Sequence, residues 1–384
     1  MIVTNLGVGE NGTSAAAAQT LRRIDPANVM AFLRCQQRKL CYDCHAERKA
    51  FEETAQKTMK LFVRISLAVA AFSVAQAATC CGAETIRVAV QKTGTFAWEL
   101  AVIRAHGLDR QANLAIEVSD LASPEAGKIA LRGGSADVIV SDWLWVSRER
   151  GLGAKLTFYP YSSALGAVMV PNSSSIRKMA DLRGRKLAVA GGPIDKNWLL
   201  LRASMKQDGI DLKSESTIVY GAPPLLAAKT LSGEMDATVN YWNFCAALEA
   251  KGLRRLAGVE DLLPKLGAKG RTAMIGYVFD EGWGNANRDA VARFIAISRE
   301  AKEILASSDE EWEKIAPLTG AADAATLRAF RDRYREGIPR RSIADEEADA
   351  RVLYRVLAAI GGRELVGPAP ELDSGTFYHL VPGD

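Results

Sequence analysis

GSADVIVSDW, residues 134–143, returns further along the chain as GEMDATVNYW, residues 233–242. Each copy places a glycine and an aspartate before a run of apolar and β-prone residues, and each ends on a tryptophan, Trp143 or Trp242. A short apolar run that follows a glycine turn is typical of a buried strand. The repetition therefore predicts that the chain contains two similar structural units.

Each copy of this motif closes a run in which strands and helices alternate. The expected strands are residues 85–90, 114–121, 136–142, 185–192, 216–221 and 235–242, and the expected helices between them are residues 96–106, 124–131, 195–206 and 224–232. Strands separated by helices form a parallel sheet that is covered by helices on both faces. We therefore predict an α/β fold with two similar Rossmann-like lobes and a central cleft.

The chain is expected to cross between the lobes twice. The apolar segment ALGAVMVPN (164–172) enters the second lobe, and RTAMIGYVF (271–279) leaves it. Lobe one is then residues 84–165 plus 272–384, and lobe two is residues 166–271. Beyond residue 280 the sequence is mostly helical, and we expect this C-terminal region to pack on lobe one.

A secretory signal peptide is predicted at residues 59–83. Lys60 and Arg64 precede an apolar run at 65–75, and the small-residue site Ala75-Gln76-Ala77 follows it. Because such signals begin a chain, we expect translation to start at Met59 and residues 1–58 to be an upstream or disordered segment. The mature protein would begin between residues 78 and 84 and would be periplasmic. Cys80 follows a bulky threonine, so a lipid anchor is disfavoured.

Upstream of this signal lies CYDCHAE (41–47), which contains the Cys-x-x-Cys-His signature of c-type haem attachment. Haem is attached outside the cytoplasm, whereas this motif precedes the export signal. A small zinc site that includes Cys35 is the other functional interpretation. The interpretation we favour is that the segment has no function, and no cofactor or metal is expected for the mature chain.

The composition is typical of a soluble globular protein. The net charge is +4, but residues 84–384 carry equal numbers of basic and acidic side chains, so no nucleic-acid partner is expected. Cys245 is the only cysteine in residues 84–384, which precludes a disulfide within them. Residues 84–384 contain only two histidines, His106 and His379, which disfavours a catalytic or metal site built on histidines. We therefore expect a monomer that is not an enzyme.

The segment MVPNSSSIRKMADLRGRKLAVAGGP (169–193) resembles the periplasmic substrate-binding proteins of nitrate/sulfonate/taurine-type ABC transporters, mainly through DLRGRKLA (181–188). GEMDATVNYW and NANRDAVARFIAISREA (285–301) are also similar to that family. The resemblance covers about residues 84–384. It implies the type II periplasmic binding fold of the thiamine-precursor-synthase-like proteins, a ligand held between the lobes, and an inner-membrane ABC permease and ATPase as partners.

The ligand site is predicted from the ends of the strands, where open α/β sheets bind ligands and helix N-termini favour anions. The candidates are Lys92, Thr93, Thr95, Phe96, Ser141, Asp142, Trp143, Tyr161, Ser162, Gly192, Asp195, Lys196, Asn197, Asn240, Tyr241 and Trp242. Lys92 and Lys196 are the expected partners of a ligand acid group. Trp143 and Trp242 occupy equivalent positions in the repeats, and we expect them to sandwich the ligand. Asp142 either accepts from a ligand amine or caps the following helix.

Three alternatives to a binder of a small organic anion remain open. The ligand could be a planar, polyacidic quinone-type cofactor, which tryptophans and lysines suit. The protein could be an enzyme on the same bilobed scaffold, as in porphobilinogen deaminase or thiamine-precursor synthase. In that case Cys245 should be accessible at the cleft. An anchored sensor would require residues 59–78 to remain uncleaved.

Overall fold

The computed structural model describes residues 82–91 and 94–380. The chain divides into two units, and all the described residues belong to the second, Gly82–Asp384. The expected upstream segment 1–58, and residues 59–81 of the expected signal peptide, lie outside the described residues. So do the site candidates Lys92 and Thr93.

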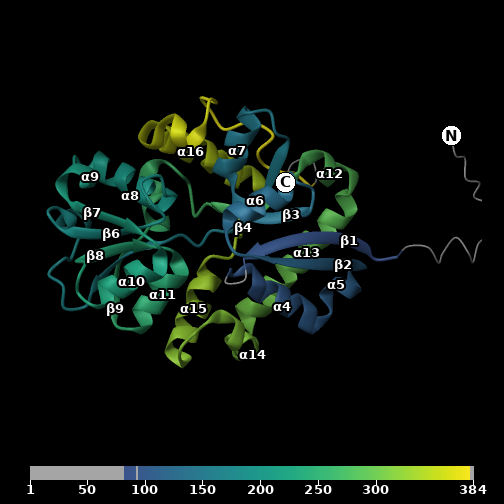
Figure 1. Ribbon diagram of the computed structural model, residues 1–384, viewed down its shortest axis with the longest axis horizontal. Coiled ribbons are helices and arrows are strands. Elements are labelled where there is room, and N and C mark those ends of the chain that lie inside the picture. The colour runs from purple at the N-terminus through teal and green to yellow at the C-terminus, as the bar shows by residue number, and fades with distance from the viewer. Residues whose placement is uncertain (1–81, 92–93, 381–384) are drawn as a thin grey trace, which may run out of the picture. The chain divides into compact units, whose positions relative to one another are not determined.

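Two five-stranded sheets with the same plan form the centre of this unit (Figure 1). The first has the order β2-β1-β3-β10-β4 and the second β7-β6-β8-β5-β9. The strands are β1 (Glu84–Gln91), β2 (Leu114–Leu121), β3 (Val138–Asp142), β4 (Leu156–Ser162), β5 (Ala167–Pro171), β6 (Lys186–Ala190), β7 (Thr217–Gly221), β8 (Ala237–Asn240), β9 (Leu253–Gly258) and β10 (Ile275–Asp280). In each sheet the first three strands are parallel, and an antiparallel strand, β10 or β5, lies between two others. This confirms the predicted α/β fold with two similar lobes.

Helices surround the sheets. They are α4 (Phe96–His106), α5 (Leu108–Gln111), α6 (Pro124–Arg132), α7 (Trp143–Gly151), α8 (Lys196–Gln207), α9 (Leu212–Glu215), α10 (Pro223–Leu231), α11 (Trp242–Ala250), α12 (Glu281–Ala286), α13 (Arg288–Ser307), α14 (Asp309–Thr319), α15 (Ala324–Glu336) and α16 (Ile343–Val366), with short 3-10 turns at Met179–Leu182, Glu260–Leu262 and Pro264–Leu266. Side chains fix where several of them begin. Ser123, Asp142 and Asp195 each accept a backbone N–H of the following first turn.

The aspartate of the repeated motif has the same structural role in both lobes. Asp137 accepts the N–H of Arg87 at 2.8 Å and donates its own N–H to the Arg87 carbonyl at 2.8 Å. Asp236 makes the matching pair of bonds with Lys186, at 2.7 and 3.0 Å. Each aspartate thus joins the start of the third strand to the first strand of its sheet, which explains why the motif occurs twice.

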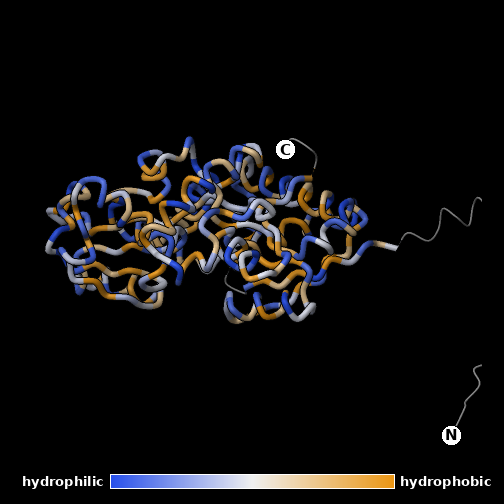
Figure 2. Tube along the Cα trace, turned by 90° about the horizontal axis from the view of Figure 1, so that it is seen from above, coloured by the Kyte–Doolittle hydropathy of each residue, from blue (hydrophilic) through white to orange (hydrophobic). Residues whose placement is uncertain are grey.

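The C-terminal helices pack on both lobes. α13 and α14 contact α4 of the first lobe, whereas α15 contacts α11 and α16 contacts α8 in the second. Leu199 and Leu200 of α8 and Ala246 of α11 belong to the same buried hydrophobic cluster as the core of the first sheet. The lobes therefore share apolar packing, in addition to the two crossing segments. Apolar residues occur along the trace of both lobes (Figure 2), and the inner strands β3, β6 and β8 are largely buried.

The second crossing segment is held by carboxylates of α16. Glu346 accepts the N–H of Ala273 at 2.7 Å, and Asp349 accepts those of Lys269 and Gly270 at 2.9 and 3.1 Å. Glu346 is 1% exposed, and its other oxygen has no hydrogen-bond partner among the described residues. Burial, opposed by the Ala273 N–H and Arg341, raises the pKa of Glu346 to about 7.

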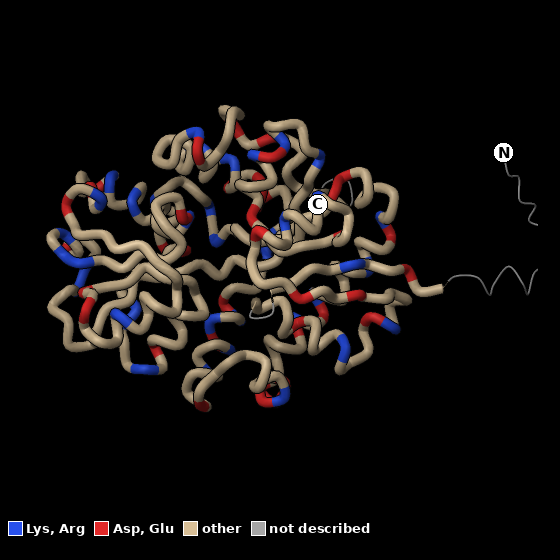
Figure 3. The backbone as a smooth tube through the Cα atoms, viewed as in Figure 1, with Lys and Arg blue, Asp and Glu red and all other residues tan. Residues whose placement is uncertain are grey.

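Charged residues of both signs are interspersed along the backbone of the two lobes (Figure 3). Within the described ranges, no helix combines the length and the apolar character that crossing a bilayer requires.

Candidate ligand-binding pocket

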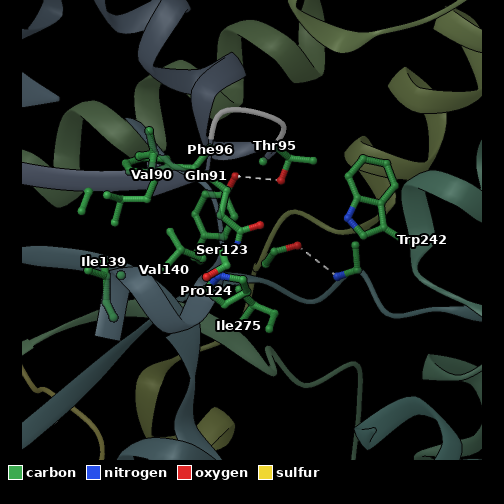
Figure 4. Close-up of a pocket in the computed structure, with 17 residues that line it drawn as sticks. Val90, Gln91, Thr95, Phe96, Ser123, Pro124, Ile139, Val140, Trp242 and Ile275 are labelled. Carbon is green, nitrogen blue, oxygen red and sulfur yellow. Dashed lines mark hydrogen bonds between the residues drawn. The ribbon is translucent and has the colours of Figure 1, made fainter. Parts of the chain in front are cut away.

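A cavity of about 160 Å³ lies at the carboxyl ends of the first sheet's strands (Figure 4). Its polar wall is formed by Gln91 at the end of β1, Thr95 before α4, Ser123 before α6, and Tyr161 and Ser162 at the end of β4. Its apolar wall comes from Val90, Phe96, Pro124, Ile139, Val140 and Ile275, and Trp242 is contributed by the second lobe. At about 10–15 Å³ per water, this space corresponds to roughly 11–16 water molecules, which suits a small molecule.

Two helices begin at this cavity. Thr95 and Phe96 line it at the start of α4, and Ser123 and Pro124 line it at the start of α6. The side chain of Thr95 makes no capping bond to α4, whereas Ser123 accepts the N–H of Ala126 at 3.2 Å. Helix N-termini carry a partial positive charge. Among the lining residues that the structure describes, none is charged, and the two helix N-termini contribute a partial positive charge at the cavity that favours an anion.

A buried charge network lies behind the polar wall. Glu99 of α4 is completely buried and pairs with Lys302 of α13 at 2.6 Å. The same carboxylate accepts the hydroxyl of Tyr334 at 2.6 Å, that of Ser298 at 3.2 Å and that of Tyr277 at 3.4 Å. Burial lowers the pKa of Lys302, although Glu99 opposes the shift. This network sets the charge environment of the pocket wall.

Tyr161 connects that network to the cavity. Its hydroxyl lies 3.4 Å from the Thr95 hydroxyl, and its ring centroid lies 4.3 Å from Lys302 Nζ. Burial and the charge of Glu99 hold the pKa of Tyr161 well above its usual value. Phe96 packs edge-on against this ring at 5.6 Å. The tyrosine is therefore a fixed, protonated hydroxyl at the wall of the pocket.

An ion pair bridges the two lobes beside the cavity. Lys196, the first residue of α8, lies 2.9 Å from Asp142, the N-cap of α7. Asp142 also accepts the N–H of Trp145 at 2.8 Å, so it caps its helix as one sequence interpretation proposed. Burial would raise the pKa of Asp142, but Lys196 and the Trp145 N–H outweigh it and lower that pKa. Burial likewise opposes the charge on Lys196, yet Asp142 holds the lysine pKa above its usual value.

Apart from Trp242, the other second-lobe candidates lie outside the lining of the cavity. Asn197 accepts the Gly166 N–H at 2.9 Å, and Asn240 donates to the Pro223 carbonyl at 2.9 Å. Asp195 caps α8, and burial raises its pKa. Burial and the charge of Asp195 raise the pKa of Tyr241. Gly192 has φ of 113°, a conformation that favours glycine.

The expected tryptophan sandwich is not present. Trp143 is completely buried in the core of the first lobe and does not line the cavity. Ser141 is also buried and does not line it. Trp242, at the equivalent position, is only partly buried, lines the cavity and packs edge-on against Trp98 at 5.9 Å. Both following helices are covered, α7 by α16 and α11 by α15, but Trp242 at the start of α11 lies against Trp98 of the first lobe and at the cavity.

Gln91, Ser123 and Pro124 line the cavity but were not among the residues predicted from the sequence. A signal for the last two exists, because Ser-Pro after the strand 114–121 is a typical helix start at a strand's carboxyl end. The loop after this strand lies at a strand's carboxyl end, like the loops from which the ligand site was predicted.

Cys245 lies in the core rather than at the cleft. It is completely buried, and its thiol lies 3.2 Å from the Asn240 carbonyl and 3.6 Å from that of Ala167. Burial raises the pKa of Cys245 to about 12. Within the described ranges, no group of three or more His, Cys, Asp or Glu side chains is placed to hold a metal ion.

Comparisons with known proteins give a family and a fold. Residues 102–311 match the family described as NMT1/THI5 like. The fold is similar to that of the alkanesulfonate-binding protein SsuA from Xanthomonas axonopodis pv. citri bound to MOPS, with a TM-score of 0.56, 20% identity, and coverage of 75% of this chain and 96% of that one. The periplasmic aliphatic sulphonate binding protein SsuA from Escherichia coli is similar with a TM-score of 0.60 and 21% identity, over 75% of this chain and 95% of that one.

An enzyme shares the same fold. The desulfurization enzyme DSZB is similar with a TM-score of 0.51 and 15% identity, over 72% of this chain and 92% of that one. No curated protein matches the sequence. At these identities the solved structures establish the fold of this chain.

Proposed function

Since the chain belongs to the NMT1/THI5-like family, we propose that it is a periplasmic solute-binding protein that captures a small organic anion and delivers it to an ABC permease and ATPase. The proposed ligand classes are sulfonates, nitrate, taurine-like molecules and small aromatic acids. The observation that carries the proposal is the cavity onto which α4 and α6 both open with their N-termini.

The size of the cavity favours a small ligand over a quinone-type cofactor. About 160 Å³ suits a molecule of roughly 11–16 non-hydrogen atoms, if each takes the volume of one water. Its apolar wall, with Trp242 and Ile139, suits a short carbon chain or a single ring, while the helix N-termini suit the acid group.

Binding is also favoured over catalysis. An enzyme that used a thiol would need it at the cavity, and the Cys245 thiol is buried away from it with its pKa raised to about 12. The likeness to a desulfurization enzyme concerns the fold, which hosts several functions.

Calorimetric titration with ethanesulfonate, taurine, nitrate and benzoate tests the proposal. We expect saturable one-to-one binding of at least one of them. Gly127 lines the cavity, and a Cβ there would meet Ile139 and Leu121 at ordinary contact distances of 3.8 and 3.9 Å. A larger side chain in Gly127→Leu should therefore fill the cavity and abolish binding.

The matched control is Ile129→Ala, on the same helix but 72% exposed, which should bind as the unsubstituted protein does. Binding that survives Gly127→Leu would place the ligand elsewhere. Absence of binding by all four probes would contradict the assignment of a small anion.

A further inference from the structure

A second, smaller cavity adjoins the ligand cavity. Its volume is about 10 Å³, which is the space of roughly one water molecule. Two residues, Ala164 and Trp242, line both cavities, so the cavities meet at these side chains. Because Ala164 has only a methyl group, the indole ring of Trp242 forms most of the wall between them. Figure 4 shows this ring at the edge of the ligand cavity, apart from the other labelled side chains.

The walls of the two cavities differ in their chemistry. No described residue that lines the ligand cavity is charged, whereas the second cavity is lined by the charged residues Arg255, Glu260, Arg271, Arg333 and Glu336. Arg333 pairs with Glu249 and with Glu336, each at 2.8 Å. Arg271 donates to the Glu336 carbonyl at 3.0 Å. These groups therefore have their partners within the protein.

Arg255 and Glu260 each keep one polar atom without a partner. They form an ion pair through Arg255 Nη2 and Glu260 Oε1. The other two atoms, Arg255 Nη1 and Glu260 Oε2, are buried and make no hydrogen bond to any described residue. The second cavity thus offers one donor and one acceptor from the same ion pair. A hydroxyl both donates and accepts and so matches them, whereas a methyl group would leave both atoms unpaired.

Trp242 can be replaced without loss of the first lobe's core. It comes from the second lobe, while most of the other lining residues belong to the strands of the first sheet or to the starts of α4 and α6. The ring is only partly buried, and it packs edge-on against Trp98 at 5.9 Å. A smaller side chain at this position would therefore open the wall between the two cavities.

We propose that Trp242 determines which ligands are accepted, because its ring limits the length of the ligand's tail and keeps the tail out of the second cavity. A tail that passes this position must end in a group that both donates and accepts a hydrogen bond. This inference rests on the proposed function and narrows its ligand class to anions whose tail ends at the indole ring.

Two series of probes measure the limit by calorimetric titration. They are the alkane-1-sulfonates from two to fourteen carbons, and the ω-hydroxyalkane-1-sulfonates of the same lengths. With the unsubstituted protein, the affinity for the alkane series should rise about fourfold per methylene, from about 0.8 kcal/mol per buried CH₂, and then fall. The cavity volume, after the four atoms of the sulfonate group, places the fall at roughly 7–12 carbons.

Trp242→Ala should weaken the binding of short probes, because they lose contact with the ring. The fall should move to chains at least two carbons longer in the hydroxyl series. The alkane series should gain less, since a methyl end would meet Arg255 Nη1 and Glu260 Oε2. Trp242→Phe is the matched control, because it keeps a ring at the wall and should keep the fall at its original length.

Two further variants complete the test. Trp242→Leu should move the fall in the same direction, and it decides the matter if Trp242→Ala does not fold. Adding Arg255→Met and Glu260→Leu together to Trp242→Ala removes both polar atoms without leaving a single buried charge. The preference for the hydroxyl end among long chains should then disappear.

Each result has a distinct meaning. A length limit that stays unchanged in folded Trp242→Ala or Trp242→Leu would overturn the inference, as would an equal gain of both series in those variants. Affinity that keeps rising to fourteen carbons in the unsubstituted protein would also overturn it. None of these results would affect the proposed function. Failure of every probe to bind the unsubstituted protein would overturn the proposed function for sulfonates, and the inference with it.

Discussion

Replacing Trp143 should affect stability, whereas replacing Trp242 should affect binding, although the two residues are equivalent in the sequence repeat. Trp143 is completely buried, and the loss of a buried tryptophan to alanine costs about 3–5 kcal/mol. Trp242 is partly buried and lines the cavity. Trp242→Ala should therefore cost less stability, but it should weaken ligand binding by about 2–4 kcal/mol, as is typical of aromatic anchors.

A phenylalanine at position 143 refines this test. The Trp143 indole N–H is buried and has no hydrogen-bond partner among the described residues. An unpaired buried donor costs about 1–3 kcal/mol, so Trp143→Phe removes that cost while it loses part of the ring's packing. The two effects oppose each other, and we expect a net change below about 1–2 kcal/mol.

Urea unfolding and calorimetric titration on the same preparations measure both quantities. Urea midpoints at constant slope give the change in the free energy of unfolding. A stable Trp143→Ala protein with weakened affinity would refute the core assignment of Trp143. A destabilised Trp242→Ala protein with unchanged affinity would refute the placement of Trp242 at the ligand.

Three further predictions concern single side chains. The pKa of Glu346 is about 7 in the folded protein, against an ordinary value of 4.5. Between pH 4.5 and pH 7 the folded state therefore binds more protons than the unfolded state, and the free energy of unfolding falls as the pH rises. Glu346→Gln should remove this loss and be more stable than the parent by up to about 3 kcal/mol above pH 7 and by little below pH 4.5, as urea midpoints across pH will show. Asp142→Asn should keep the helix cap but remove the negative charge that pairs with Lys196. The affinity for an anionic sulfonate, measured by calorimetry, should therefore rise several-fold. A fall in affinity would indicate that Asp142 itself contacts the ligand. Cys245 should resist a thiol reagent until the protein is unfolded by urea, and rapid labelling of the native protein would contradict its burial.

The fold was predictable because local signals agree along the whole chain. Apolar runs after glycine turns locate the strands, and capping residues such as Asp195 locate the helix starts. The repeated aspartates, Asp137 and Asp236, make the same backbone bonds in both lobes, so a sequence repeat corresponds to a structural repeat.

The site was less predictable, because it depends on contacts between distant segments. Sequence places Trp143 and Trp242 at equivalent positions, but the packing of α16 and α15 differs at the two places. The partner of Lys196 is Asp142, which lies on the other lobe, and no spacing rule relates them. The contact between the hydroxyls of Thr95 and Tyr161 likewise joins segments that are far apart in the sequence.

The position of β10 between β3 and β4 has a consequence for how the protein is made. During synthesis the first sheet lacks an inner strand until Ile275–Asp280 has emerged, so β3 and β4 each keep an unpaired edge that can pair wrongly. The second sheet, β5–β9, is complete in one continuous stretch and can form earlier. Pulse-labelling hydrogen exchange during refolding should show protection of β6 and β8 before β3, and the interval between them is the period in which a chaperone would be needed.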